Sequence, residues 1–188
     1  MIVILKDIEL GKTRFTEHLI QLNALSFKKW IFETGMLFLS EKKWWGDKGY
    51  RRHRHNGLDI RLYETSEGTL TTINEETRIP IIYEGRIVSI IKDFLGRSLF
   101  AAHEIYDGNF QLYTIYGHVI QATSIVTGKF LNEGTPVATL AKASDAQVPS
   151  HLHVSVALVP KTIPPETLTW DILDKNEGIS FLDPGHII

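Results

Sequence analysis

The hydrophobic pattern of this chain changes character near residue 55. Between Thr13 and Leu25 the apolar residues recur with the spacing of a helix, at Phe15, Leu19, Ile20 and Leu22. An apolar cluster without a clear period follows between residues 27 and 38. We therefore expect residues 1–45 to form an accessory N-terminal segment that is partly helical.

Beyond residue 55 the helical period gives way to short segments rich in Ile, Val and Tyr, with glycines between them. The expected strands are 57–63, 79–91, 98–106, 110–117, 119–126, 136–141 and 151–158. The pair Asp107-Gly108 predicts a hairpin, because glycine readily adopts the positive φ of a tight turn. We expect residues 160–180 to form a long surface loop with a helical turn at 165–173. The pattern predicts a mostly β fold, with an antiparallel sheet or sandwich over residues 46–188.

The composition narrows the classes of function. The 188 residues suit one domain with an appendage, and a net charge of −2 argues against a nucleic-acid partner. No apolar run is long enough for a transmembrane segment, and the apolar start Met1–Leu5 is too short for an export signal. The chain has eight histidines and no cysteine, so a metal site has to use histidine and carboxylate.

The first candidate motif is His55-Asn-Gly-Leu-Asp59. Its histidine and carboxylate can reach one metal ion if the backbone turns at Gly57, and both ligand types suit Zn²⁺. The same spacing occurs in His103-Glu-Ile-Tyr-Asp107, where the aspartate belongs to the predicted hairpin turn. We interpret His103 and Asp107 as structural.

The second candidate motif starts a strand in which residues alternate between two faces. Leu152, Val154, Val156 and Leu158 share the apolar face, while His151 and His153 project together from the other. A third candidate, His118, ends the second strand of the hairpin. His55, Asp59 and one histidine of the 151/153 pair would give the three protein ligands of a catalytic zinc site. The remaining histidines could then handle protons, which is the chemistry of an amide-cleaving metallohydrolase.

Three motifs, in this order, resemble those of the lysostaphin-like zinc metallopeptidases, most of which cut peptide cross-links of bacterial peptidoglycan. His55-Asn-Gly-Leu-Asp59 looks like the family's H-x-G-x-D, Tyr116-Gly-His118 like its Y-x-H, and Ser150-His-Leu-His153 like its histidine pair. The resemblance covers residues 45–188. One departure is Val154-Ser155, where the family usually has F-E.

The resemblance implies His55, Asp59 and His153 as ligands of Zn²⁺, with His118 and His151 as the catalytic pair. It also implies the lysostaphin-like β fold, a peptidoglycan peptide as substrate, and a location in the cell envelope or outside the cell. An asparagine in an N-terminal segment blocks the zinc in some relatives, but we do not assign that role to Asn23. The oligomeric state is left open.

Two alternatives accompany this interpretation. Relatives that serve as non-catalytic envelope scaffolds, or as regulators of other wall hydrolases, have usually lost ligands, whereas all five site residues are present here. A metallopeptidase with another protein substrate would use the same residues. His53 has no catalytic or metal-binding role in any of these interpretations. We place it on an exposed basic rim, together with Arg51, Arg52 and Arg54, and we expect this rim to meet acidic groups of the substrate.

Overall fold

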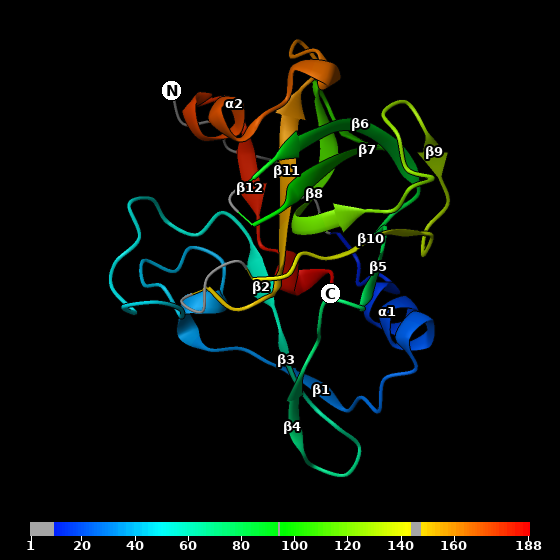
Figure 1. Cartoon of the computed structure of the whole chain (residues 1–188). Coiled ribbons are helices and arrows are strands. Elements are labelled where there is room, and N and C mark those ends of the chain that lie inside the picture. Colours follow the sequence, from blue (N-terminus) through cyan, green and yellow to red (C-terminus); the bar gives the residue numbers. More distant parts are fainter. Residues whose placement is uncertain (1–9, 94, 144–147) are drawn as a thin grey trace.

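Antiparallel strands form most of the computed structural model, which describes residues 10–93, 95–143 and 148–188 (Figure 1). The start Met1–Leu5, which the sequence analysis considered as an export signal, lies outside the described residues. The strands are β1 (Lys29–Ile31), β2 (Leu58–Ile60), β3 (Leu62–Glu64), β4 (Leu70–Thr72), β5 (Arg78–Pro80), β6 (Gly85–Lys92), β7 (Arg97–Asp107), β8 (Phe110–Gln121), β9 (Phe130–Leu131), β10 (Pro136–Leu140), β11 (Leu152–Pro160) and β12 (Ser180–Leu182).

Two sheets contain these strands. The larger one runs in the order β12-β11-β8-β7-β6-β9, while β2 pairs with β11, and β10 pairs with both β5 and β8. The smaller sheet has the order β1-β3-β4. Every pair of strands is antiparallel, as the sequence predicted. The predicted hairpin joins β7 to β8, with Asp107 opposite Phe110 and Gly108 at a φ of 55°.

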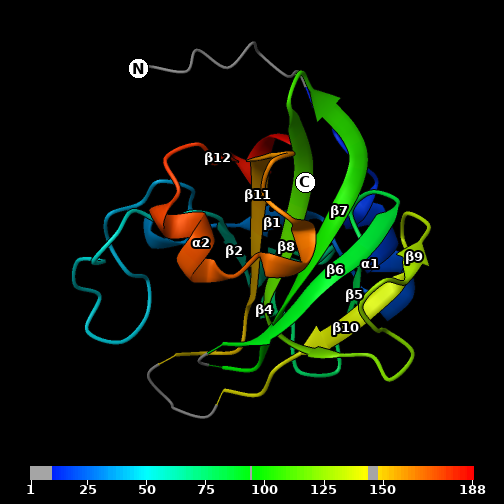
Figure 2. The ribbon, with the colours of Figure 1, turned by 90° about the horizontal axis from the view of Figure 1, so that it is seen from above.

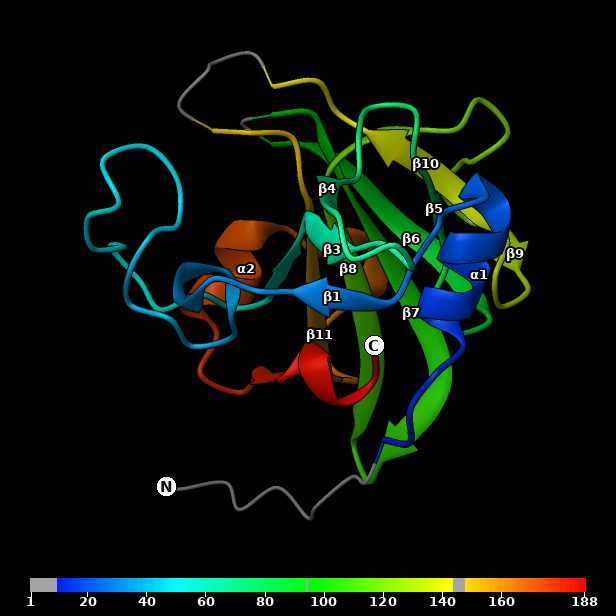
Figure 3. The ribbon, with the colours of Figure 1, turned by 90° about the horizontal axis from the view of Figure 1, so that it is seen from below.

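The larger sheet is buried on both faces. Leu152, Val154, Val156 and Leu158 of β11 pack into one apolar cluster, while Ala157 and Val159 pack into a second one. The first cluster is covered by α1 (Phe15–Asn23), which contributes Phe15 and Leu19, and the second by α2 (Trp170–Lys175). Figures 2 and 3 show α2 on one side of the sheet and α1 with the smaller sheet on the other.

The predicted N-terminal helix is present as α1, and the described part of the N-terminal segment is packed against the strands. Trp30 of β1 lies opposite Tyr63 of β3, and α1 contacts β5. Asn23, at the end of α1, donates to the carbonyl of Arg78 and accepts from its N–H, so it binds β5 and lies apart from the candidate metal ligands. The division of the chain at residue 45 stays a prediction.

Some strand boundaries differ from those expected. The segment 79–91 is two strands, because the chain leaves the ladder after Pro80: Ile81 donates to Thr135 and Ile82 to the hydroxyl of Tyr116. The expected strand 119–126 is the end of β8 followed by a turn from Ala122 to Ile125. The short strands β1, β4, β9 and β12 were not predicted. They contain two or three residues each, too few for a period to show.

The expected helical turn at 165–173 corresponds to a 3₁₀ turn (Pro165–Thr167) and the start of α2. The threonine before α2, Thr169, accepts from Ile172 through its side chain and caps the helix. Two further 3₁₀ turns lie at Thr34–Met36 and Pro184–His186. No helix among the described residues is long and apolar enough to cross a membrane.

His103 has the structural role that the sequence analysis gave it. It is fully buried, with Nδ1 2.9 Å from the carbonyl oxygen of Glu84 and Nε2 2.8 Å from Thr114 Oγ1. Thr114 Oγ1 in turn lies 2.9 Å from the hydroxyl oxygen of Tyr116. Burial lowers the pKa of His103 to about 4. The ring is therefore a neutral member of a buried polar chain between β7 and β8.

Because of His103, the free energy of unfolding is expected to decrease as the pH is lowered. Between about pH 6.5 and 4 the unfolded chain binds a proton at His103 that the folded chain does not. As the pH is lowered through this range, the free energy of unfolding should therefore decrease, and His103 should account for up to about 3 kcal/mol of the decrease. Urea unfolding of the metal-free protein at pH 7.5 and at pH 4.5 measures this decrease. The excess stability of the wild type over His103→Gln should shrink at the lower pH, with exposed His186→Gln as control. An excess independent of pH would contradict the prediction.

Candidate metal centre

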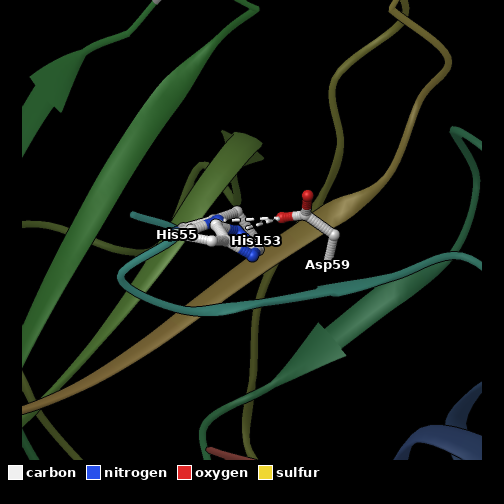
Figure 4. A group of neighbouring side chains, drawn as sticks. All are labelled: His55, Asp59 and His153. Carbon is white, nitrogen blue, oxygen red and sulfur yellow. Dashed lines mark hydrogen bonds and ion pairs between the residues drawn. The ribbon is translucent and has the colours of Figure 1, made fainter. Parts of the chain in front are cut away.

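Three predicted ligands meet at the β2–β11 pair (Figure 4). The register places Asp59 of β2 directly opposite His153 of β11, and His55 lies in the loop that enters β2. The Oδ1 atom of Asp59 lies 3.0 Å from His55 Nε2 and 2.9 Å from His153 Nδ1. The two ring nitrogens are 3.1 Å apart. Three donor atoms therefore form a small triangle, and all three side chains are buried.

The outer nitrogen of each ring has its own partner. His55 Nδ1 lies 2.9 Å from the carbonyl oxygen of Leu37, which only accepts, so the ring carries its proton on that side. His153 Nε2 lies 2.9 Å from Ser155 Oγ, two residues along the same strand. Ser155 is one of the two residues that depart from the family pattern, and here it contacts a candidate ligand from behind. With the outer nitrogens protonated, both inner nitrogens present lone pairs.

This donor set fits a zinc ion. When both rings carry a proton only on the outer nitrogen, their inner lone pairs and one carboxylate oxygen converge on one point, and a cation at that point offsets the repulsion among them. Zinc–ligand bonds of about 2.0–2.1 Å at tetrahedral angles separate the ligand atoms by about 3.4 Å, close to the edges of this triangle. The outer partners of the two rings are typical of histidine ligands in zinc sites. The residues present can therefore hold Zn²⁺ with three protein ligands.

The second oxygen of Asp59 is held by groups that the sequence analysis did not place at the site. Oδ2 accepts from the indole N–H of Trp44 at 2.7 Å and from the guanidinium of Arg51 at 3.3 Å. Trp44 is 5% exposed. Burial opposes the charge of Asp59, but the surrounding histidines outweigh it and keep the pKa of the carboxyl well below its usual range. Asp59 is therefore a buried carboxylate bound on both sides.

Two glycines provide the space that the ligands need. A Cβ on Gly57 would lie 2.4 Å from the carbonyl oxygen of Val154 and 2.7 Å from the ring of His153. A Cβ on Gly117 would lie 3.2 Å from the Cβ of His153. The chain bends at Gly57, as the sequence analysis expected, with a φ that is not positive, and the close approach of β11 leaves no room for a side chain there.

His118 and His151 lie beside the triangle. The Nδ1 atom of His151 is 2.7 Å from the carbonyl oxygen of Pro149, so its other nitrogen, Nε2, carries a lone pair and lies 3.7 Å from Asp59 Oδ1. Burial lowers the pKa of His151 to about 4. The ring of His118 lies with its centroid 4.8 Å from that of His151 and 5.9 Å from that of His153. All five predicted site residues are thus close together.

The predicted basic rim is present in part. His53 and Arg52 are exposed, and Arg54 is exposed and paired with Glu41. Arg51 is an exception: its side chain is only 16% exposed, because the guanidinium points inward to Asp59 and to the carbonyl of Gly35. An open groove of about 690 Å³ extends over the metal centre, and its walls include Trp45, Tyr50, Arg52, Arg54 and Trp170.

Comparison with known proteins gives similar solved structures only. No family model matches the chain, and no curated protein does. The catalytic domain of the antimicrobial peptidase lysostaphin from Staphylococcus simulans is 16% identical, with a TM-score of 0.47 over 89% of this chain and 94% of that one. A zinc-containing peptidase from Vibrio cholerae is 16% identical, with a TM-score of 0.44 over 86% of this chain and 41% of that one.

Trp44→Phe is expected to weaken zinc binding about 10-fold to 100-fold, since it removes a donor to the far oxygen of Asp59 but keeps an aromatic ring. Competition with a chromophoric chelator measures the affinity. Trp30→Phe is the matched control, because it deletes the indole N–H that donates to Thr16, far along the chain from the ligands. Equal zinc affinities in both variants would show that the Trp44 contact does not support the site.

Gly57→Ala is expected to displace His153 and to lower zinc affinity by at least about 10-fold, because the added methyl meets backbone and ring atoms that cannot both move away. Isothermal titration of the metal-depleted protein with zinc measures this. Gly11→Ala serves as control, since a Cβ there has nothing within 4 Å. A Gly57→Ala protein that binds zinc as the wild type does would contradict the close-approach argument.

Proposed function

We propose that this chain is a zinc-dependent endopeptidase that hydrolyses amide bonds in peptidoglycan peptides. The observation that carries the proposal is the convergence of three zinc-type donor atoms, all about 3 Å apart, beneath an open groove with two further histidines at their side. His55, Asp59 and His153 are the proposed ligands, and His118 and His151 the proposed catalytic pair.

Zinc bound by the three ligands would act as a Lewis acid that brings the pKa of water toward neutrality. The protein supplies the geometry for this. Asp59 is oriented by its contacts to Trp44 and Arg51, and each ligand histidine is held by the partner of its outer nitrogen. Ser155 belongs to β11 and the other three partners lie between β1 and β2, so the ligand atoms are positioned before substrate binds.

His151 is proposed to exchange a proton with the reacting water. Its Nδ1–H donates to Pro149, which leaves the lone pair of Nε2 directed toward the ligands. Attack of water on the substrate carbonyl carbon releases a proton, and collapse of the tetrahedral adduct requires a proton on the leaving nitrogen. A neutral imidazole next to the ligands can accept the first, and His118 can hydrogen-bond the oxyanion or protonate the amine once its ring also carries a proton on Nε2.

The groove suits an extended peptide with acidic groups. Its walls offer aromatic faces at Trp45 and Tyr50 and a positive charge at exposed Arg52. Peptide strands in bacterial walls carry free carboxylates, which exposed Arg52 can bind. A substrate of this kind lies outside the cytoplasm, and we therefore expect the protein in the cell envelope or outside the cell.

His151→Ala is expected to lower peptide release from purified peptidoglycan by about 10²-fold to 10⁴-fold while one equivalent of zinc stays bound. Mass spectrometry of the digest and metal analysis of the same sample measure the two quantities. Exposed His186→Ala is the control. Chelation should abolish cleavage by the wild type, and added zinc should restore it.

Other outcomes would support the alternatives. Retention of the protein on intact peptidoglycan without release of peptides, at full zinc occupancy, would overturn the proposal in favour of a non-catalytic scaffold. Cleavage in a peptide library combined with no release from peptidoglycan would keep the peptidase chemistry and reject the substrate.

A further inference from the structure

His118 lies at an irregular position in β8. On β7, Arg97 pairs with Val119 and Leu99 with Tyr116, so one more residue separates the partners on β8 than on β7. This is a β-bulge, and it contains Gly117 and His118. His118 also has a φ of 63°, which is uncommon for a residue other than glycine. The backbone is therefore held in a costly conformation next to the metal centre.

The bulge determines which face of the sheet His118 occupies. Simple alternation would place it with Tyr116, whose side chain packs in the first apolar cluster. The ring instead lies against His151 and His153, on the opposite face. Without the irregular backbone, the histidine would point away from the groove.

Asp93 contacts both the backbone and the ring of His118. Its Oδ2 atom accepts from the backbone N–H of His118 at 2.8 Å and lies 3.2 Å from the Nδ1 atom of its ring. The side chain of Asp93 is 5% exposed. One carboxylate oxygen thus binds the main chain of the bulge and the imidazole that the bulge redirects.

The remaining contacts of Asp93 fix its own position. Oδ1 accepts from the backbone N–H groups of Leu95 and Gly96, at 3.0 and 2.6 Å, and closes the turn between β6 and β7. Ser98 donates its hydroxyl to Oδ2 and itself accepts from the indole of Trp170. Burial opposes the charge of Asp93, but the hydrogen bonds it accepts hold its pKa well below the usual range, so the carboxylate is fixed in place and ionised.

We propose that Asp93 is a positioning residue for His118: it stabilises the bulge and holds the imidazole through the hydrogen on Nδ1, so that the ring stays on the side of His151 and His153. The proposal rests on the proposed function for the part that His118 plays, but the geometry of the Asp93–His118 pair can be tested without substrate. Asp93 lines the groove, but among the described residues it makes no hydrogen bond or ion pair with the three ligands, so its part in the site is through His118.

The test compares the full chain with Asp93→Asn and Asp93→Ala. The asparagine keeps the shape and an acceptor oxygen but removes the charge, and its NH₂ group favours a lone pair on Nδ1. Asp183→Asn is the matched control, because Asp183 also closes a turn through Oδ1, to Gly185. Zinc content and thermal unfolding are measured for each, and Asp93→Asn covers the case in which Asp93→Ala fails to fold.

The first readout is the protonation of the His118 ring, from ¹H–¹⁵N spectra of histidine-labelled protein with the signals assigned by His118→Gln. We expect Nδ1–H in the wild type and in Asp183→Asn, and a shift to Nε2–H in Asp93→Asn. An unchanged ring in Asp93→Asn would overturn the proposal, whether or not the protein is a peptidase.

The second readout is peptide release. Asp93→Asn should lower kcat about 10²-fold or more with little change in KM and zinc content, and it should add nothing when His118 is already Ala. A loss that is equally large in the His118→Ala background would overturn the positioning role. If the wild type releases no peptide, the proposed function fails and the ring spectra still decide the proposal on Asp93.

Discussion

The candidate metal centre depends on the burial of one carboxylate, that of Asp59. Taking an isolated charge out of water costs several kcal/mol, so a buried carboxylate needs partners for both oxygens. Here one oxygen faces the rings of His55 and His153, and the other accepts from Trp44 and Arg51. The pairing of β2 with β11, the loop before β2 and the segment around Trp44 all converge on this group. The centre consequently forms only where the fold brings these three segments together, and no single strand contains it.

The four histidines of the centre reach it by different backbone routes. His153 follows from the alternation of β11, and His151 comes immediately before that strand. His55 depends on the close approach permitted by Gly57, and His118 on a bulge with a positive φ. Regular structure therefore positions part of the site, and strained or crowded backbone positions the rest, as is frequent where side chains have to converge on one point.

The sequence predicted the features that depend on local pattern. The period of two at residues 151–158 identified β11 and showed which side chains share a face, since this alternation is built into any strand. The motif spacings and the family resemblance selected the five residues that the structure brings together. The contacts of Trp44 and Arg51 with Asp59 were not predictable, because they cross a loop with no periodic pattern. Arg51 was accordingly placed on the rim, although it points inward.

Asp93 shows a different limit of sequence analysis. An aspartate three residues before Gly96 is typical of a turn, and a turn is what it forms. Its contact with His118 requires a register shift between β7 and β8, and nothing in the local sequence marks that shift. Alternation alone would even have assigned His118 to the wrong face. Bulges are therefore where pattern-based assignment of site residues is weakest.

The strands β2 and β3 are separated only by Arg61, yet they belong to different sheets. In the smaller sheet β3 is the central strand, and β1 of the N-terminal segment covers one of its edges. A chain shortened to residues 46–188 would leave that edge open, with a row of unpaired backbone N–H and C=O groups beside Tyr63. Such an edge is a template for pairing with another chain. The N-terminal segment therefore also keeps neighbouring copies from joining through β3.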